Sequence, residues 1–198
     1  MTPFFNPGPI DHPNIPIYIA GVNELLCKTA GEICDGFHVH PLHTTEYIKD
    51  LIIPNIEVGC ESTDRNLKDV SISGSAFVIT GPDSDSMIKT REFVRSQIAF
   101  YSSTPTYSKV LETHGWGDIA KELNRLSSSG NFKDMPELIT DEILETVAII
   151  GAPNEIAPLA AKKYSGLLDR INFYLPFDSN MSPEMSYWWK NTIKAIQS

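Results

Sequence analysis

The stretch 17–47, IYIAGVNELLCKTAGEICDGFHVHPLHTTEY, predicts a strand, a helix and a second strand. Its first residues, 17–20, form a short apolar run that ends at Gly21. Asn23 is a suitable N-cap for the helix, and the apolar residues that follow recur at helical spacing: Leu25, Leu26, Ala30 and Ile33. Residues 37–40 then alternate between apolar and polar side chains, as in a strand. Two strands joined by a helix of this length are expected to lie parallel, with a right-handed connection.

The turn between the first strand and its helix is a candidate anion-binding site. Gly21 is expected at the carboxyl end of the strand, where the next helix presents unpaired N–H groups. A residue without a side chain lets a ligand approach the backbone closely. Gly21, Val22 and Asn23 are therefore predicted to bind the phosphate of a cofactor, although an ordinary strand-to-helix turn would have the same sequence.

The rest of the chain repeats this strand-helix alternation. Further strands are predicted at about 72–80 and 171–175, with an insertion of several helical segments between them. The domain boundaries follow from composition: 1–16 is a proline-rich, extended lead-in, 17–178 is the main domain, and 179–198 is a carboxyl-terminal helix. The expected fold class is α/β with a parallel sheet.

Composition excludes several classes of protein. The 198 residues are 41% hydrophobic and 21% charged, which is typical of a globular chain. A net charge of −9 without a basic cluster argues against nucleic acid or an anionic membrane as the main partner. No apolar run is long enough to span a membrane, and the expected location is the cytoplasm. The three cysteines are too few for a disulfide framework, and Cys27 and Cys34 are expected to be small buried residues.

Histidines cluster at the end of the second strand. A metal site could be assembled from Cys34, His38, His40 and His43, but their spacing matches no usual zinc pattern, and no metal is predicted. His38 and His40 should share one face of the strand. His40, nearer the strand end, is the candidate pocket and catalytic residue, whereas His38 is expected to be a hydrogen-bonded core residue. His43 could contact substrate or phosphate, or could simply be solvated.

Hydroxyl groups follow the helix after the third strand. The segment 102–107, SSTPTY, carries Ser103, Thr104 and Tyr107. Ser103 and Thr104 are candidates for binding a polar cofactor tail, and Tyr107 for lining the substrate pocket. The alternative is that these hydroxyls only terminate and cap helices.

Together these segments resemble a known family. The sequences IYIAGVN, AGE-x-x-DG, HPLHT, FVITG, IAFYSSTPTY, LETHGWGD and IIGAPNEIAPLAAKKYSGLLDRINFYLP resemble the carboxyl-terminal half of luciferase-like monooxygenases, over 16–177. The branch that uses coenzyme F420, a deazaflavin, is the most similar. The FYSSTPTY and HGWGD segments are the most specific parts of the resemblance.

The resemblance implies a partial (β/α)₈ barrel, roughly its strands five to eight with an insertion after the third strand of this chain. In that family coenzyme F420 or FMN binds at the carboxyl ends of the strands. The expected function is a flavin- or deazaflavin-dependent oxidoreductase that performs hydride transfer or oxygen insertion on a small-molecule substrate. A complete barrel needs eight strands, so the chain is expected either to be a fragment that lacks the first half of the barrel, or to form a homo-oligomer or bind a partner that supplies that half.

Two other functions stay open at this point. The chain could be a non-catalytic remnant that serves as an assembly subunit of such an enzyme. It could also be an unrelated half-barrel that handles phosphorylated compounds without a flavin.

Overall fold

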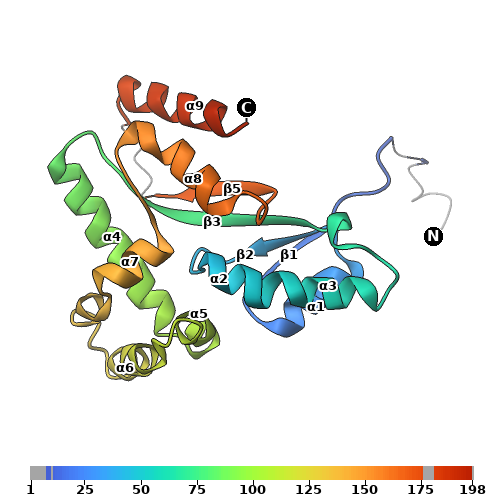
Figure 1. Cartoon of the computed structure of the whole chain (residues 1–198), viewed down its shortest axis with the longest axis horizontal. Helices are drawn as coiled ribbons and strands as arrows, with labels where there is room; N and C mark the ends of the chain where they lie inside the picture. The colour runs from blue at the N-terminus through green and yellow to red at the C-terminus, as the bar shows by residue number, and fades with distance from the viewer. Residues whose placement is uncertain (1–7, 10, 176–180, 198) are drawn as a thin grey trace.

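The chain forms an α/β fold around a parallel sheet (Figure 1). The computed structural model describes residues 8–9, 11–175 and 181–197. The strands are β1 (Tyr18–Gly21), β2 (Gly36–Val39), β3 (Ser71–Ile79), β4 (Ile149–Ile150) and β5 (Arg170–Tyr174). Every strand pairing is parallel. The sheet therefore has the parallel pairing that the repeated strand-helix alternation predicts.

The long strand β3 organises the sheet. Its first residues pair with β2, its central residues pair with β5, and its last two pair with the short β4. Strand β1 pairs with β2. The four longer strands thus lie side by side in the order β1-β2-β3-β5, and β1, β4 and β5 each pair with a single strand of the described sheet.

Helical segments connect the strands. Those up to β3 are α1 (Glu24–Ile33), α2 (Thr45–Tyr47), the π-helix η2 (Ile48–Ile52), α3 (Ile53–Glu61) and η3 (Leu67–Asp69). Those after β3 are α4 (Ser84–Ser102), η4 (Pro105–Tyr107), α5 (Ser108–Glu112), α6 (Gly117–Ser128), η5 (Met135–Leu138), α7 (Asp141–Val147), η6 (Pro153–Glu155), α8 (Ile156–Tyr164) and α9 (Pro183–Gln197). Among the residues that the structure describes, no helix is long and apolar enough to cross a membrane.

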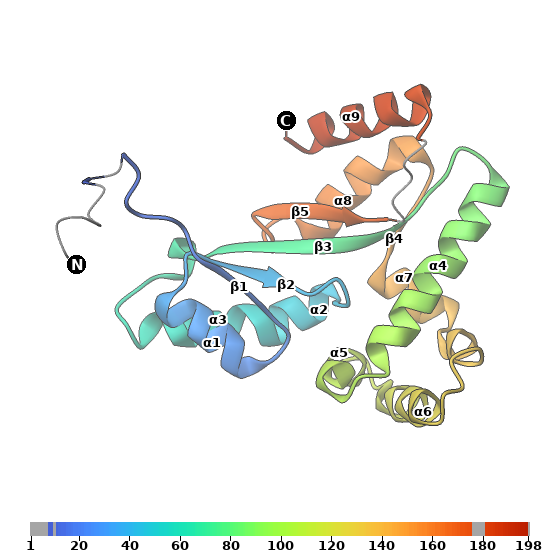
Figure 2. The ribbon, with the colours of Figure 1, turned by 180° about the vertical axis from the view of Figure 1, so that it is seen from behind.

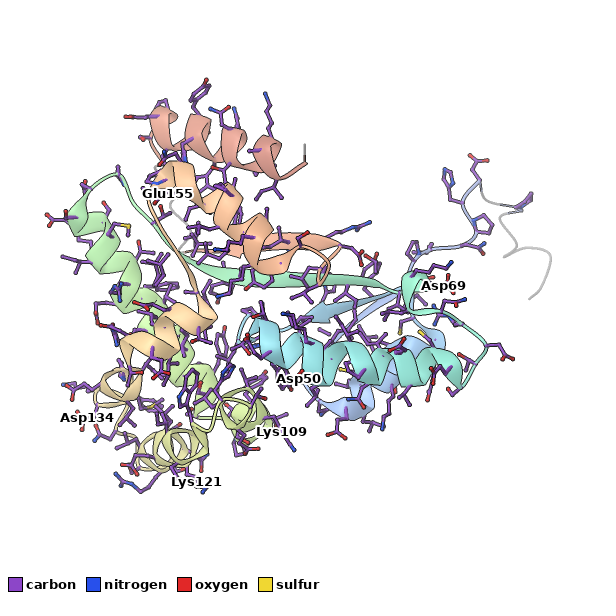
Figure 3. The ribbon with its side chains drawn as sticks, viewed as in Figure 1. Asp50, Asp69, Lys109, Lys121, Asp134 and Glu155 are labelled. Atoms are coloured by element: carbon purple, nitrogen blue, oxygen red, sulfur yellow. The ribbon has the colours of Figure 1, made fainter. Side chains whose placement is uncertain are left out.

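Two views show how these helices are arranged. Helices α1 and α3 lie on one side of the sheet, and α4, α5, α6 and α7 form a separate group near the carboxyl end of β3 (Figures 1 and 2). Charged side chains such as Asp50, Lys109, Lys121 and Asp134 point outward from the helices (Figure 3). The helical segments predicted as an insertion, from residue 102 onward, include α5, α6 and α7 of this group, whereas α4 is the helix predicted to follow the third strand.

Two glycines fix the crossing of α1 and α3. A Cβ at Gly31 would lie 2.1 Å from the carbonyl oxygen of Ile56, and one at Gly59 would lie 2.0 Å from that of Lys28. The two backbones therefore approach more closely than any side chain would allow. This contact uses the helix face of small residues, so Cys27 and Ala30 are also buried.

The predicted apolar stripe of α1 was only partly right. Ala30 is buried, but Leu25 is 72% exposed and Ile33 is 73% exposed. The close approach at Gly31 turns the small residues toward α3 and the larger apolar ones away from it. The prediction that Cys27 and Cys34 are buried is confirmed.

Alternate residues of the strands form two different faces. One, which we call the apolar face, consists of Ile19, Phe37, Val39, Ile72, Ala76, Ile171 and Phe173, and these belong to or pack against the hydrophobic core. The other, which we call the polar face, carries Tyr18, Ala20, His38, His40, Ser73, Ser75, Arg170, Asn172 and Tyr174. Several of its side chains are exposed, among them His38 and Asn172.

One row of the polar face shows how its side chains meet. His38 is in register with Ser73, and its Nδ1 is hydrogen-bonded to the Ser73 hydroxyl. The ring of Tyr18 lies 5.2 Å from that of His38, and the Arg170 guanidinium lies 5.9 Å from the centre of the Tyr18 ring. His38 is thus hydrogen-bonded, as expected, but it is exposed and not in the core, because it points away from the helix-covered side.

The predicted domain boundaries stay predictions. Residues 11–16 carry no helix or strand and are exposed, and α9 covers most of the predicted carboxyl-terminal helix. The other parts of the predicted lead-in, 1–7 and 10, lie outside the described residues, as do 176–180 and 198.

Candidate functional site

An aromatic cluster lies at the carboxyl end of the polar face. It consists of His40, just after β2, Tyr101 near the end of α4, and Tyr107 in η4. His40 stacks on Tyr107 with ring centres 4.5 Å apart, and it meets Tyr101 edge-on at 4.7 Å. Two of the predicted site residues, His40 and Tyr107, are therefore in contact although they are far apart in sequence.

A hydrogen bond to the His40 ring fixes which ring nitrogen carries the proton. The backbone N–H of Leu42 donates to Nδ1 of His40 over 3.1 Å, so in the neutral ring the proton is on Nε2. Burial lowers the pKa of His40 and keeps the ring neutral near pH 7. Nε2 has no hydrogen-bond partner among the described residues. The site therefore presents an imidazole N–H that can donate a hydrogen bond.

A chain of hydroxyls continues from the aromatic cluster into the sheet. The hydroxyls of Tyr101 and Tyr174 are 3.1 Å apart, and Tyr174 donates to the side-chain oxygen of Gln97 over 3.5 Å. Because the Tyr174 proton points to Gln97, Tyr101 is the donor to Tyr174. This bond, with burial, raises the pKa of Tyr101 to about 12. The chain holds Tyr101 protonated and fixes its ring beside His40.

His43 is buried behind the aromatic cluster. It is 1% exposed, its Nδ1 donates to the carbonyl oxygen of His40 over 2.7 Å, and its Nε2 lies 3.1 Å from the Tyr164 hydroxyl. A carbonyl only accepts, so Nδ1 carries the proton and Nε2 accepts from Tyr164. Burial lowers the pKa of His43 to about 4.

The alternative that His43 is solvated is therefore wrong, because the loop after β2 turns it toward α8 and away from water. Its contact with the carbonyl of His40 holds the residue that lines the site. A direct contact of His43 with substrate stays a prediction.

The predicted anion-binding turn lies beside the end of β2. Gly21 is in register with Val39, Val22 is buried and its carbonyl accepts from the Tyr47 hydroxyl, and Asn23 caps α1 by accepting from the Leu26 N–H at 3.1 Å. The cap role of Asn23 is confirmed. The first two amides of α1 have no acceptor within the helix and can face a ligand.

The glycine at this turn also has a packing reason. A Cβ at Gly21 would lie 2.8 Å from the side chain of Leu26. Gly21 is therefore needed by the fold whether or not a ligand approaches the turn. Its role in cofactor binding, like those of Val22 and Asn23, stays a prediction.

Ser103 and Thr104, which follow α4, differ in the contacts of their hydroxyls. Ser103 is 4% exposed, and its hydroxyl donates to the carbonyl of Phe100 over 2.7 Å, which terminates the helix. Thr104 is exposed and makes no capping hydrogen bond. The hydroxyl of Thr104 is thus open to a ligand, while that of Ser103 is engaged in capping.

Two buried hydroxyls flank this region without a hydrogen-bond partner. They belong to Thr80, just after β3, and to Ser102, at the end of α4, and both have no partner among the described residues. A buried hydroxyl without a partner is uncommon and carries a cost in stability. No group of three or more acidic, cysteine or histidine residues in the described ranges has the geometry to hold a metal ion.

Sequence reasoning missed several residues that shape the site. Tyr101 and Tyr174 were not singled out, although each stands in a quoted motif, FYSST and INFY. The alternation of 170, 172 and 174 in β5 was a usable signal, since it puts Tyr174 on the polar face. Tyr164, which bonds His43, is a single tyrosine in a helix and gave no signal.

Comparisons with known proteins agree on one family. The family model described as luciferase-like monooxygenase matches residues 1–170. An uncharacterised protein of Mycobacterium tuberculosis strain H37Rv is 37% identical over 171 residues, which are 86% of this chain and 50% of that protein. A 5,10-methylenetetrahydromethanopterin reductase of Methanopyrus kandleri is 26% identical over 152 residues, 76% of this chain and 42% of the reductase.

A solved structure shares the fold. The coenzyme F420 dependent tetrahydromethanopterin reductase from Methanopyrus kandleri superposes with a TM-score of 0.64 at 21% identity, covering 92% of this chain and 49% of that one. The chain thus spans about half the length of the relatives that it matches.

Proposed function

Because the chain belongs to the luciferase-like monooxygenase family, we propose that it is the cofactor-binding half of an oxidoreductase that uses coenzyme F420 or FMN. The observation that carries the proposal is the aromatic cluster of His40, Tyr101 and Tyr107 at the carboxyl ends of parallel strands. Ligands of α/β proteins bind at these strand ends. The relatives include an F420-dependent reductase, which supports the deazaflavin as the first candidate.

The residues present fit such a cofactor. A planar ring system is matched by the aromatic walls of the cluster and by the N–H donor of His40. An anionic tail is matched by the first amides of α1, beside Gly21, and by the exposed hydroxyl of Thr104. Thr80, which directly follows β3, adds a buried hydroxyl without a partner among the described residues at the carboxyl end of that strand.

The residues of this chain would position the cofactor and exclude water. When bound, the deazaflavin or flavin supplies the hydride transfer or oxygen chemistry. His40 would donate a hydrogen bond from Nε2, its ring held by Leu42 and by Tyr107. Tyr101 stays protonated at neutral pH because its pKa is raised to about 12.

Two open sheet edges support the proposal that the barrel is completed by another chain segment. Among the described strands, β1 pairs only with β2, and β5 pairs only with β3. A cavity of about 970 Å³ follows the edge of β5, lined by residues such as Ile171, Phe173 and Trp189. Unpaired, apolar edges favour pairing with another strand, from a second copy or from a partner with the first half of the barrel.

The test is a titration of coenzyme F420 and of FMN into the chain alone, and into the chain with the first half of a family member supplied in trans. Wild type is compared with His40→Ala and with His40→Phe, which keeps the stacking on Tyr107 but removes the N–H donor. His12→Ala is the control, because His12 is exposed in the lead-in.

We expect binding in the completed barrel, with altered cofactor absorbance in both His40 variants and none in the control. Circular dichroism checks that the variants are folded. Identical spectra and affinities in wild type and both His40 variants would remove the aromatic cluster from the site. Absence of binding by either cofactor in the completed barrel would favour the non-catalytic assembly subunit.

A further inference from the structure

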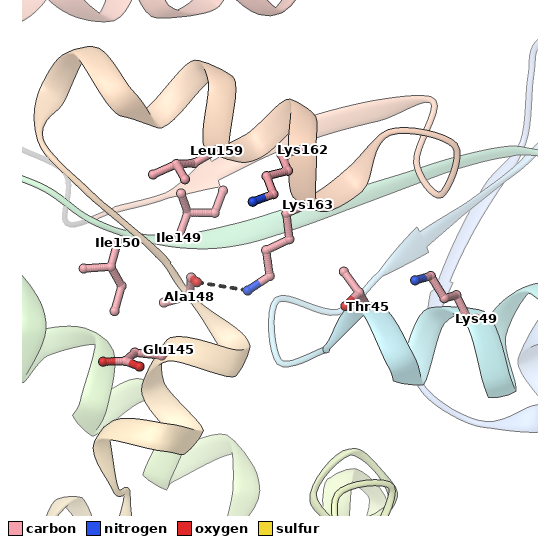
Figure 4. A pocket seen from close by; sticks show the side chains of 9 residues that line it. All are labelled: Thr45, Lys49, Glu145, Ala148, Ile149, Ile150, Leu159, Lys162 and Lys163. Carbon is pink, nitrogen blue, oxygen red and sulfur yellow. Dashed lines mark hydrogen bonds between the residues drawn. The ribbon is translucent and has the colours of Figure 1, made fainter.

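A second cavity lies between α8, β4 and the start of α2 (Figure 4). Its volume is about 610 Å³. Its lining includes Thr45, Lys49, Ile149, Leu159, Lys162 and Lys163. Three lysines from two separate segments thus line one cavity, in a chain with more acidic than basic residues.

The three ammonium groups outnumber the carboxylates near them. None of them forms an ion pair within the described ranges, where the ion pairs involve Arg91, Arg95, Lys121 and Arg125. Glu145 also lines the cavity, but its carboxylate points away from the lysines in Figure 4. Glu46 accepts a hydrogen bond from Thr45 over 2.9 Å and acts electrostatically on Lys49 and Lys163. Three lysines against these two carboxylates leave one positive charge in excess.

Lys163 is held in place by the backbone. Its Nζ donates to the carbonyl oxygens of Thr146 over 2.7 Å and of Ala148 over 3.0 Å. An ammonium group has three N–H donors, so one is left for a ligand. Burial lowers the pKa of Lys163 to about 8, which means that a nearby anion would stabilise its charged form.

The cavity also has an apolar wall. It consists of Ile149 and Ile150 of β4 and of Leu159 of α8, the helix that carries Lys162 and Lys163. An inorganic ion would leave this wall in contact with water, whereas an organic group would cover it. The ligand that matches both walls has an anionic group and an apolar body.

We propose that this cavity binds the phosphate group of a small organic phosphate, with Lys49, Lys162 and Lys163 around the phosphate and Ile149, Ile150 and Leu159 against the organic part. Lysine ammonium groups act as point charges that suit a phosphate dianion without demanding the planar geometry of a carboxylate. The site lies outside the proposed cofactor site, since its lining shares no residue with the aromatic cluster.

The test is calorimetric titration of phenyl phosphate and of inorganic phosphate into the full chain at pH 7. We expect phenyl phosphate to bind more tightly, because the apolar wall contacts its ring. Lys49→Gln and Lys162→Gln, both at exposed positions, should each weaken binding by about threefold, and the double variant by about tenfold. Lys121→Gln is the matched control, because Lys121 is paired with Asp118 on α6, and its affinity should be unchanged.

A second measurement addresses Lys163 directly. Repeating the titration near pH 8 in buffers of different ionisation enthalpy should show proton uptake, because the phosphate raises the pKa of the buried amine. Lys163→Met should abolish the uptake. If Lys163→Met does not fold, the affinities of the Lys49→Gln and Lys162→Gln variants test the proposal without it. No binding of phenyl phosphate by wild type, or equal affinity in wild type and the Lys49/Lys162 double variant, would overturn the proposal.

Discussion

The two faces of the sheet are built from alternate residues of the same strands, yet they have different roles. Phe37 and Val39 of β2 point to the apolar face and are buried, while His38, between them, points to the polar face and is exposed. On the apolar face the core side chains pack against helices. On the polar face the contacts are hydrogen bonds and ring contacts such as that of His38 with Ser73.

This difference separates stability from binding. Burial of apolar side chains is the main favourable term in folding, so the apolar face holds the chain together. Exposed polar groups that converge at one end of a parallel sheet are instead available to a ligand. Substitutions on the two faces should therefore have different consequences, even at adjacent positions.

The largest effect is expected for Phe37→Ala. Phe37 is 0% exposed, and its removal leaves a cavity against the helices, which should lower the free energy of unfolding by about 4 kcal/mol. His38→Ala, one residue further along β2, removes only a hydrogen bond to Ser73 and a ring contact, and should cost less than about 1 kcal/mol. Urea unfolding followed by circular dichroism measures both.

The adjacent pair is its own control, because both variants change the same strand. If the two substitutions cost the same, the polar face is covered in solution, for example by a second copy of the chain. Concentration dependence of the unfolding midpoint would then identify that association.

A change of stability with pH, of intermediate size, is expected from His43, which is buried in the loop after β2. Its pKa is lowered to about 4 in the folded chain and is about 6.5 in the unfolded chain. The unfolded state therefore binds a proton first as the pH falls. The contribution of His43 to the free energy of unfolding should be complete above pH 6.5. The free energy of unfolding should decrease by up to about 3 kcal/mol as the pH falls to 4.

Urea unfolding at several pH values between 4 and 7 tests this expectation. His43→Gln should flatten the dependence on pH, whereas His12→Ala, at an exposed position, should leave it as in wild type. A pH dependence that is unchanged in His43→Gln would mean that other groups, His40 among them, account for the whole effect.

Much of the fold follows from local sequence patterns. Alternation and strand-helix spacing predict that the four longer strands are parallel, and Asn23 is recognisable as an N-cap from its place before the helix. Cys27 and Cys34 are small enough to be expected inside. The sequence does not predict which face of α1 is buried. Leu25 and Ile33 are more apolar than Gly31, but α3 packs closely against the face that carries Gly31, so the larger apolar side chains stay exposed.

The site is harder to predict because it depends on contacts between distant segments. His40 and Tyr107 were proposed separately, and only the fold shows that their rings stack. The burial of His43 depends on Tyr164, which comes 121 residues later. Lys163 was not recognised at all, since two backbone carbonyls in α7 and the residue after it hold its ammonium group.

A small effect, comparable with that of His38→Ala, is expected for Tyr101→Phe, and it sharpens the comparison most. The substitution keeps the ring that meets His40 and removes the hydroxyl that donates to Tyr174. One lost hydrogen bond should lower the free energy of unfolding by about 1 kcal/mol. The hydroxyl of a residue that contacts the polar face would thus contribute little to stability, although the ring of that residue shapes the proposed site.

Ultraviolet titration of tyrosinate formation provides the readout that a purely structural role would not affect. In wild type, Tyr101 should ionise with a pKa of about 12, because its proton is held by Tyr174 and its ring is partly buried. Tyr101→Phe should remove that component, while Tyr187→Phe, whose side chain is 67% exposed in α9, should leave it in place. Tyr47 and Tyr164, whose pKa values burial also raises, still ionise at high pH in this variant, so the readout is the loss of one tyrosine's amplitude near pH 12. If that amplitude is as large in Tyr101→Phe as in wild type, the hydroxyl chain does not hold the Tyr101 proton, and the ring beside His40 is positioned by packing alone.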